Sequence, residues 1–346
     1  MINDILPIYQ LSLCQKLLLQ ATLLQGEHAM QAWDCWQSLI DIEDLDSSSN
    51  VLLPQLYKNL LIHDVKHPYM ARLKGIYRRN WYANQLRLKD LKITLSYLKD
   101  DEIDVIILGK ASFGSYPIEN CRSIDSFRLL VQEKYLERAN QKLTAVNWQE
   151  DDPTPKTLIH LQGHLFWAIP QDHIDNLVWH NATPDWSDRL GWRLSVTDQF
   201  LDSCTRTFFK GHSQQIYGIA DVMILIQNSS NDIDWMRLVS QAQRYQMILP
   251  VRNMLIILQN ILKPSVPNWV LPALWQMPIA HAEWLSYKIL ADDKRSFWQS
   301  IYAHSVRPLN YFGTKLRELK QTPFPGRQVL KSLLKPTKSA INLDKW

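Results

Sequence analysis

The chain has 346 residues, of which 46% are hydrophobic and 21% are charged, and it includes 14 tryptophans. This composition excludes intrinsic disorder, and the length suffices for one large domain or for two to three smaller ones. Ten glycines argue against glycine-rich barrels and dinucleotide-binding loops, and four scattered cysteines without a CxxC pair argue against a disulfide framework or a zinc ribbon. The net charge of +4 hides an asymmetry, because residues 307–346 contain nine Lys or Arg against two acidic residues.

Residues 1–100 are predicted to be helical. Leucines recur every three or four residues in LCQKLLLQATLLQ (13–25), and AWDCWQSLIDI (32–42) continues the pattern. We interpret DLDSSSN (44–50) as a polar loop and predict a single long helix over 70–99. The leucine repeat of that helix consists of Leu88, Leu91, Leu95 and Leu98.

The first half of the long helix is basic and includes the run RRNWY (78–82). A run of this kind suits contacts with nucleotide phosphates or with an acidic chain. A solvated helix face whose aromatic side chains pack inward is the commoner arrangement, and it is the one we favour.

Residues 101–185 are predicted to form a small mixed sheet with a few helices, because short apolar runs alternate there with one helical segment. The apolar runs are VIIL (105–108), FRLLV (127–131), TLIHL (157–161) and HLFWAI (164–169), and the helical segment is QEKYLERANQKLTAV (132–146).

From about residue 194 the pattern is helical again. SVTDQFLDSCTRTFF (195–209) begins with Ser195, a suitable N-cap, and consecutive helices are predicted over 216–227, 232–246 and 248–262. The proline-containing segments KPSVP and LPALWQMP are predicted to interrupt this series.

In this order, the segments resemble a family of bacterial uncharacterised nucleotidyltransferases within the nucleotidyltransferase-fold superfamily. The resemblance implies an α+β fold, with a small mixed-sheet nucleotidyltransferase core at 101–185. Helical regions at 1–100 and 186–306 would flank this core, and 307–346 would form a basic tail. The segments that carry the resemblance are LLPQLYKNLL (52–61), ARLKGIYRRNWYANQLRL (71–88), VIILGKASFGSYPIENCRSIDSFRLLV (105–131), HLQGHLFW (160–167), YGIADVMILI (217–226) and DIDWMRLVSQAQRY (232–245).

Such proteins hold two divalent ions with two acids on the second core strand and a third acid on a later strand. Laid on this sequence without a gap, the three acid positions fall on Ser126, Arg128 and Gln162. A hydroxyl, a guanidinium and an amide are poor Mg²⁺ ligands, and Arg128 places a fixed cation where an anion is needed. These departures from the family pattern imply that metal-dependent catalysis is lost, and we expect no metal site and no cofactor.

Asp125 is the possible substitute ligand. If a bulge turned its side chain inward, it could act with Asp104 or Glu119, and Mg²⁺-dependent NMP transfer from an NTP would survive. The other interpretation, which we favour, is a solvent-facing or capping aspartate, because a slip of one residue in a strand reverses the face on which a side chain lies.

A phosphate site that needs no metal is a further hypothesis, because Arg128 and Lys110 could hold a phosphate or a carboxylate. The candidate nucleotide- or phosphate-binding residues are Gly109, Lys110, Ser112, Arg122 and Arg128. We favour instead an ion pair between a buried Arg128 and a local acid such as Asp125 or Glu119.

His160 and His164 would share one strand face with Gln162 and suggest a metal pair. The segment HLQGH lacks the glutamate of a zinc-binding HExxH helix, so we favour ordinary strand histidines.

The tail segment GRQVLKSLLK (326–335) has an apolar stripe beside regularly spaced cations. This pattern suits contact of residues 307–346 with an anionic membrane or an acidic partner, and it equally suits a terminal helix folded back on its own domain. No apolar stretch reaches the about 20 residues that span a bilayer. Because MINDILPIYQ (1–10) lacks the basic start of a signal peptide, we expect a cytoplasmic protein.

These observations predict a nucleotidyltransferase-like protein that is catalytically inactive and acts as a binding or scaffold protein for a protein or peptide partner. No specific nucleic acid partner is expected. Two alternatives remain: an active transferase with Mg²⁺ and an NTP in an altered metal site, and a metal-independent binder of nucleotide or phosphate. Members of the family occur in assorted biosynthetic settings, so the resemblance implies a fold rather than a substrate.

Overall fold

The computed structural model describes residues 11–109, 123–147, 157–166, 172–184, 190–209 and 215–291. All of them belong to the first of two units, Met1–Pro308. The basic tail predicted for residues 307–346 lies outside the described ranges. No helix within those ranges is long and apolar enough to cross a membrane.

The N-terminal region is helical, as predicted. Its elements are α1 (Leu13–Leu23), α2 (Gly26–Leu39), the short 3₁₀ helix η1 (Ile42–Asp44), α3 (Ser47–Asn50) and α4 (Leu53–Ile62). The prediction of a polar loop at 44–50 is wrong, because one helical turn forms there. Asp46 explains this turn, since its carboxylate accepts the backbone N–H groups of Ser48 and Ser49 at 2.9 Å each.

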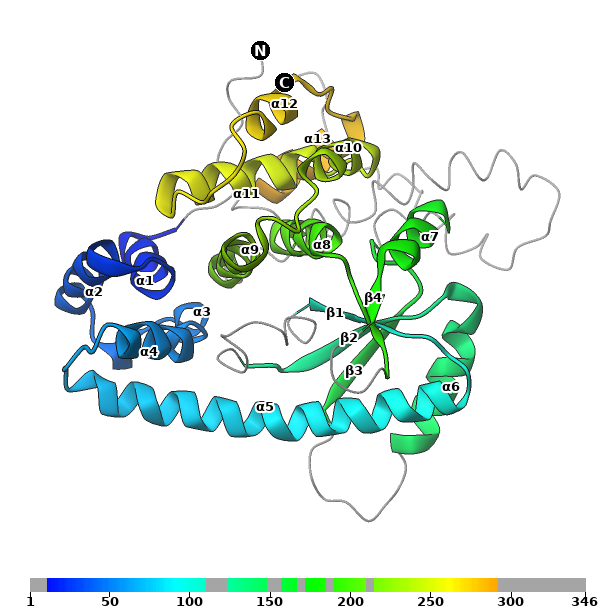
Figure 1. Cartoon of the computed structure of the whole chain (residues 1–346), viewed down its shortest axis with the longest axis horizontal. Coiled ribbons are helices and arrows are strands. Elements are labelled where there is room, and N and C mark those ends of the chain that lie inside the picture. Colours follow the sequence, from blue (N-terminus) through cyan, green and yellow to red (C-terminus); the bar gives the residue numbers. More distant parts are fainter. Residues whose placement is uncertain are drawn as a thin grey trace, which may run out of the picture. The chain divides into compact units, whose positions relative to one another are not determined.

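The predicted long helix is confirmed as α5 (Tyr69–Asp100), which joins the N-terminal helices to the sheet (Figure 1). Near its start, Leu73 is buried among residues of the N-terminal and C-terminal helices, which together form the large core. Near its end, Leu91 and Leu95 are buried in a separate small core with the sheet. Our interpretation that the aromatic residues of RRNWY pack inward is wrong, because Trp81 and Tyr82 are both exposed.

The predicted small mixed sheet is also confirmed, and with the surrounding helices it makes the fold α+β. Its strand order is β3-β2-β1-β5-β4, in which β1 runs antiparallel to β2 and parallel to β5, and β2 runs parallel to β3. The strands are β1 (Ile106–Leu108), β2 (Ser126–Leu130), β3 (Leu158–Gln162), β4 (Thr183–Pro184) and β5 (Trp192–Arg193). The strand predicted at 164–169 is absent from its described part, residues 164–166.

The helices after β2 are η3 (Glu133–Tyr135), α6 (Leu136–Asn147), α7 (Asp172–Asn181), α8 (Val196–Phe209), α9 (Gln215–Ser229), α10 (Trp235–Arg244), α11 (Ile248–Ile261), α12 (Val270–Gln276) and α13 (His281–Ala291). Ser195 caps α8 as predicted, because its Oγ accepts the N–H of Asp198 at 3.2 Å. The predicted break at LPALWQMP is wrong over most of its length. Pro272 falls in the first turn of α12, where its missing N–H leaves no helical bond unmade.

The two faces of the sheet contact different cores. Ile106 and Leu108 of β1 belong to the large core, which includes α8, whereas Ile107 between them belongs to the small core with α5 and α6. Because side chains alternate along a strand, Arg128 lies on the same face of β2 as Leu130, a residue of the large core. This alternation directs Arg128 toward α8.

Candidate functional site

Arg128 lies in the middle of β2, paired with Leu108 of β1 on one side and with His160 of β3 on the other. Its guanidinium meets Asp202 of α8, with three N–O distances of 3.4 Å to the two carboxylate oxygens. Arg128 is therefore ion-paired, as predicted, but the prediction of a local acid such as Asp125 as its partner is wrong, because the partner is Asp202 of α8. Asp202 lies 74 residues further along the chain than Arg128.

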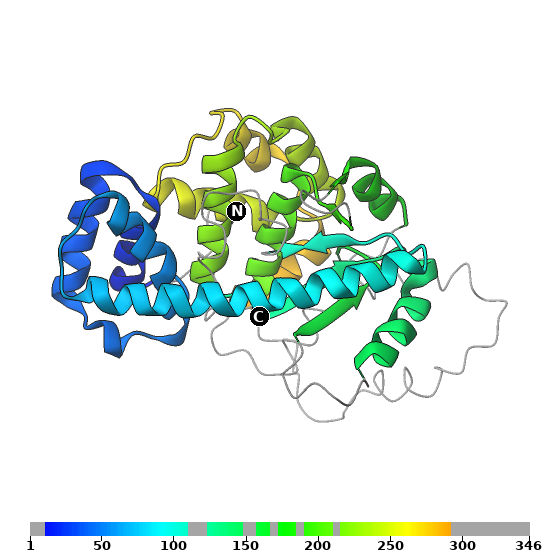
Figure 2. The ribbon, with the colours of Figure 1, turned by 60° about the horizontal axis from the view of Figure 1, so that its bottom comes forward.

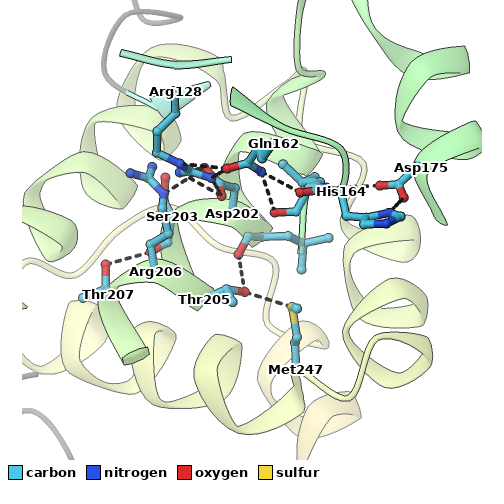
Figure 3. A network of polar contacts seen from close by, with 12 residues as sticks. Arg128, Gln162, His164, Asp175, Asp202, Ser203, Thr205, Arg206, Thr207 and Met247 are labelled. Atoms are coloured by element: carbon cyan, nitrogen blue, oxygen red, sulfur yellow. Dashed lines mark hydrogen bonds and ion pairs between the residues drawn. The ribbon is translucent and has the colours of Figure 1, made fainter. Parts of the chain in front are cut away.

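Gln162, at the end of β3, fixes the other side of the guanidinium (Figure 3). Its Oε1 accepts hydrogen bonds from Nη2 of Arg128 at 3.1 Å and from Nε at 3.3 Å. Its Nε2 donates to the carbonyl oxygens of His164 at 2.6 Å and Leu165 at 3.2 Å. The amide group is therefore engaged on both sides, which orients its oxygen toward Arg128.

Asp202 is shared by two guanidinium groups. Arg206, one helical turn further along α8, forms an ion pair with it, with 2.9 Å between Nε and Oδ2. Burial raises the pKa of Asp202, but the attraction of Arg128 and Arg206 outweighs this, so its pKa lies below the usual value. Burial lowers the pKa of Arg128, and the pairing with Asp202 offsets part of that shift. The three groups carry a net charge of +1.

Gly109, directly after β1, brings the backbone close to this cluster. Its φ of +68° lies in the region that favours glycine, and a Cβ built on it would be 3.2 Å from Nη1 of Arg206. The backbone conformation therefore favours glycine here, and the guanidinium of Arg206 packs closely against it. The end of β1 and the Arg128–Asp202–Arg206 cluster thus form one polar centre.

His164 forms a second polar contact at the same edge of the sheet. Its Nδ1 lies 2.6 Å from Oδ2 of Asp175 on α7, and Oδ1 of Asp175 accepts the N–H of Leu165 at 3.1 Å. Nε2 of His164 lies 3.6 Å from a carboxylate oxygen of Glu133. His160, which we expected on the same strand face, is exposed. No group of three or more His, Cys, Asp or Glu among the described residues is arranged to hold a metal ion.

The remaining candidate residues are placed less centrally. Ser126 begins β2 and is half-buried. Asp125 is exposed just before the strand, and its Oδ1 accepts a hydrogen bond from Ser123 at 2.8 Å. Four residues named in the sequence hypotheses lie outside the described ranges: Lys110, Ser112, Glu119 and Arg122.

Asp202 and Arg206 were missed by reading the strand–turn–strand segment alone. Their signal is the spacing of Asp198, Asp202 and Arg206 at four-residue intervals, which places three charges on one face of α8. Charged residues that repeat along one face of a helix with several large apolar side chains indicate a buried polar contact with another element.

Comparison with protein families gives one match. Residues 47–263 match a family model described as "Uncharacterised nucleotidyltransferase", a region that begins at α3 and ends just after α11. No curated protein and no solved structure gives a significant match.

Proposed function

Because the chain belongs to the uncharacterised nucleotidyltransferase family, we propose that it uses the fold without metal-dependent nucleotidyl transfer. It acts instead as a binding or scaffold protein for a protein or peptide partner. The proposal includes a bacterial source and a biosynthetic setting, which rest on the resemblance, and a cytoplasmic location, which rests on the sequence.

The observation that carries the proposal is the engagement of Arg128 by Asp202 and Gln162. Two of the three positions at which the resemblance expects metal-binding acids are Arg128 and Gln162, and these two side chains bind each other. Asp202 is the carboxylate that contacts Arg128 in the described part of the chain, and it is already neutralised by two guanidiniums. A divalent ion here would face one positive charge in excess, worth roughly 4 kcal/mol of repulsion per unit charge of the ion at 4 Å and an effective dielectric constant of about 20.

The altered-metal-site alternative depends on Asp125. Its exposure just before β2 and its hydrogen bond with Ser123 fit a solvent-facing or capping aspartate and not a ligand turned inward. We therefore rank this alternative below the inactive protein.

The phosphate-binding alternative is supported by one specific observation. The cluster carries one positive charge in excess, and the Arg206 guanidinium lies beside Gly109, one of the candidate phosphate-binding residues. Arg206 therefore joins Gly109, Lys110, Ser112, Arg122 and Arg128 in this second candidate. Calorimetric titration with ATP in EDTA tests it, since a metal-independent binder releases or absorbs heat under these conditions.

The test of the main proposal is a transfer assay on the purified full chain with Mg²⁺ and each of the four NTPs labelled at the α-phosphate. We expect no incorporation of label into the protein or added acceptors and no pyrophosphate release. The melting temperature should not depend on Mg²⁺ and ATP together. Nucleotidyl transfer would overturn the proposal, and its loss in Asp125→Ala would establish the altered metal site in its place.

A further inference from the structure

The exposed side of α5 combines cations with large apolar side chains. Arg78, Arg79, Tyr82, Leu86, Lys89 and Ile93 are all exposed, and at 100° per residue they fall within an arc of about 100°. We call these six residues the outer face of α5. Figure 2 shows α5 crossing the front of the view, between the N-terminal helices and the sheet.

The apolar part of the outer face is unusually accessible. Tyr82 is 63% exposed, Leu86 is 51% exposed and Ile93 is 44% exposed, and Trp81 beside them is 44% exposed. Single exposed apolar side chains are ordinary, but a contiguous group on one helix face marks an interaction surface.

The charged part of the outer face has no acidic residue. Within the described residues, Arg78, Arg79 and Lys89 form no ion pair, whereas the neighbouring Arg72 pairs with Glu43 at 3.0 Å. Asp90, the acid of this part of the helix, lies just outside the arc, and its Oδ2 accepts a hydrogen bond from Thr157 at 2.8 Å. The outer face therefore attracts an anionic partner.

The helix holds this surface rigid at both ends. Leu73 is fully buried in the large core, and Leu91 and Leu95 are buried in the small core. Between them, the buried Asn84 accepts the N–H of Ile124 through Oδ1 at 2.9 Å. From Arg78 to Ile93 the surface extends about 22 Å at 1.5 Å per residue. A surface fixed in this way loses little conformational entropy when a partner binds.

We propose that the outer face of α5 binds an acidic amphipathic segment of a partner protein. Carboxylates of the segment pair with Arg78, Arg79 and Lys89, while its apolar side chains pack on Tyr82, Leu86 and Ile93. Arginines and aromatic residues alone would equally suit single-stranded nucleic acid, but the exposed aliphatic Leu86 and Ile93 give nucleic acid no matching contact. This inference rests on the proposed function, because it names the chemistry of the partner and the surface that receives it.

The experiment measures binding of a fluorescein-labelled helical peptide to the full chain by fluorescence anisotropy. The peptide has about 18 residues of glutamate and leucine, with the leucines at i, i+4 spacing on one face. We expect saturable binding that weakens about tenfold or more in Arg78→Glu/Arg79→Glu, because both charges are reversed. Binding should weaken about fivefold or more in Tyr82→Ala/Leu86→Ala, because apolar anchors are removed.

The control variant is Lys16→Glu/Arg244→Glu, which has the same net charge as the first variant but alters exposed residues of α1 and α10. It should bind the peptide like the unaltered protein. Equal weakening in this control, no saturable binding, or binding that neither α5 variant weakens would overturn the inference. Tighter binding of oligo-dT than of the peptide would also overturn it, in favour of a nucleic-acid surface.

The inference and the proposed function fail separately. Nucleotidyl transfer by the unaltered protein would overturn the proposed function whatever the peptide does. Absence of transfer together with absence of peptide binding would overturn the inference alone.

Discussion

Asp202 is the residue on which the polar centre depends, because its carboxylate is buried and pairs with both Arg128 and Arg206. Replacing one partner of a buried ion pair leaves the other charge uncompensated, which is more costly than the pair itself is stabilising. The carboxylate of Asp202 is therefore compensated by guanidiniums of the protein itself. An external cation is not needed for this balance.

We expect Asp202→Asn to lower the free energy of unfolding by about 3 kcal/mol or more at neutral pH, since two guanidiniums lose their carboxylate. The pKa of Asp202 is lowered in the folded protein, so its stabilisation is fully present above the unfolded value of 3.8. This stabilisation is lost as the pH falls through the folded pKa. We therefore expect the difference in unfolding free energy between the variant and the unaltered protein to become smaller in acid. Denaturant unfolding at a series of pH values measures it.

The control for this prediction is Asp232→Asn, an exposed acid before α10, which should change the unfolding free energy by about 0.5 kcal/mol at most. The proposed role of the Asp202 charge would be contradicted by one result. This result is a difference in unfolding free energy between Asp202→Asn and the unaltered protein that stays constant down to the lowest pH.

At the scale of elements, the helices were predictable and the contacts between them were not. The leucine spacing of α5 is a local signal of period 3.6, and it located the helix to within one residue at each end. The same period places Leu73, Asn84 and Leu91 on one stripe and Tyr82 on the opposite side, so the exposure of Tyr82 was available from the sequence. It was missed because a polar residue, Asn84, continues the buried stripe.

The strands were less predictable because their pairing is not local. β4 and β5 have two residues each, too few for a periodic signal, and β5 lies beyond residue 185, where we placed the end of the core. The partner of Arg128 was missed for the same reason. Only the fold brings α8 against the face of β2, and no spacing along the chain connects Arg128 with Asp202.

Alanine substitutions at two helical glycines test the packing between helices, because we expect one to destabilise the protein and the other to stabilise it. A Cβ on Gly218 of α9 would lie 1.9 Å from Oγ1 of Thr207 on α8, whereas nothing lies within 4 Å of a Cβ on Gly75 of α5. Gly218→Ala should destabilise the protein by about 1 to 3 kcal/mol through overpacking. Gly75→Ala should stabilise it by about 0.5 to 1 kcal/mol, because alanine has the higher helix propensity. Chemical denaturation measures both.

The matched double variant Gly218→Ala/Thr207→Ala should recover part of the loss, since it removes the nearest clashing atom. Similar effects of alanine at Gly75 and Gly218 would show that helix propensity, and not the contact between α8 and α9, decides the outcome.

At the scale of the whole molecule, the sheet separates two cores, and the polar centre sits on the face that belongs to the large core. The proposed loss of metal chemistry is a property of this arrangement, because it depends on the contacts of Arg128 of β2 with Gln162 of β3 and with Asp202 of α8. A variant designed to bind a divalent ion must therefore carry substitutions on both β2 and β3.

The corresponding variant is Ser126→Asp/Arg128→Asp/Gln162→Asp, which places carboxylates at the three positions where the resemblance expects them. With Asp202 these form four carboxylates against the single guanidinium of Arg206, an excess of negative charge that a divalent ion relieves. We expect the melting temperature of this variant to rise with Mg²⁺ concentration, because an ion that binds only the folded state stabilises it by mass action. The unaltered protein and the neutral variant Ser126→Asn/Arg128→Asn/Gln162→Asn should show no such dependence. Thermal melting across a Mg²⁺ series measures all three, and an equal response of the unaltered protein would mean that its metal site was never lost.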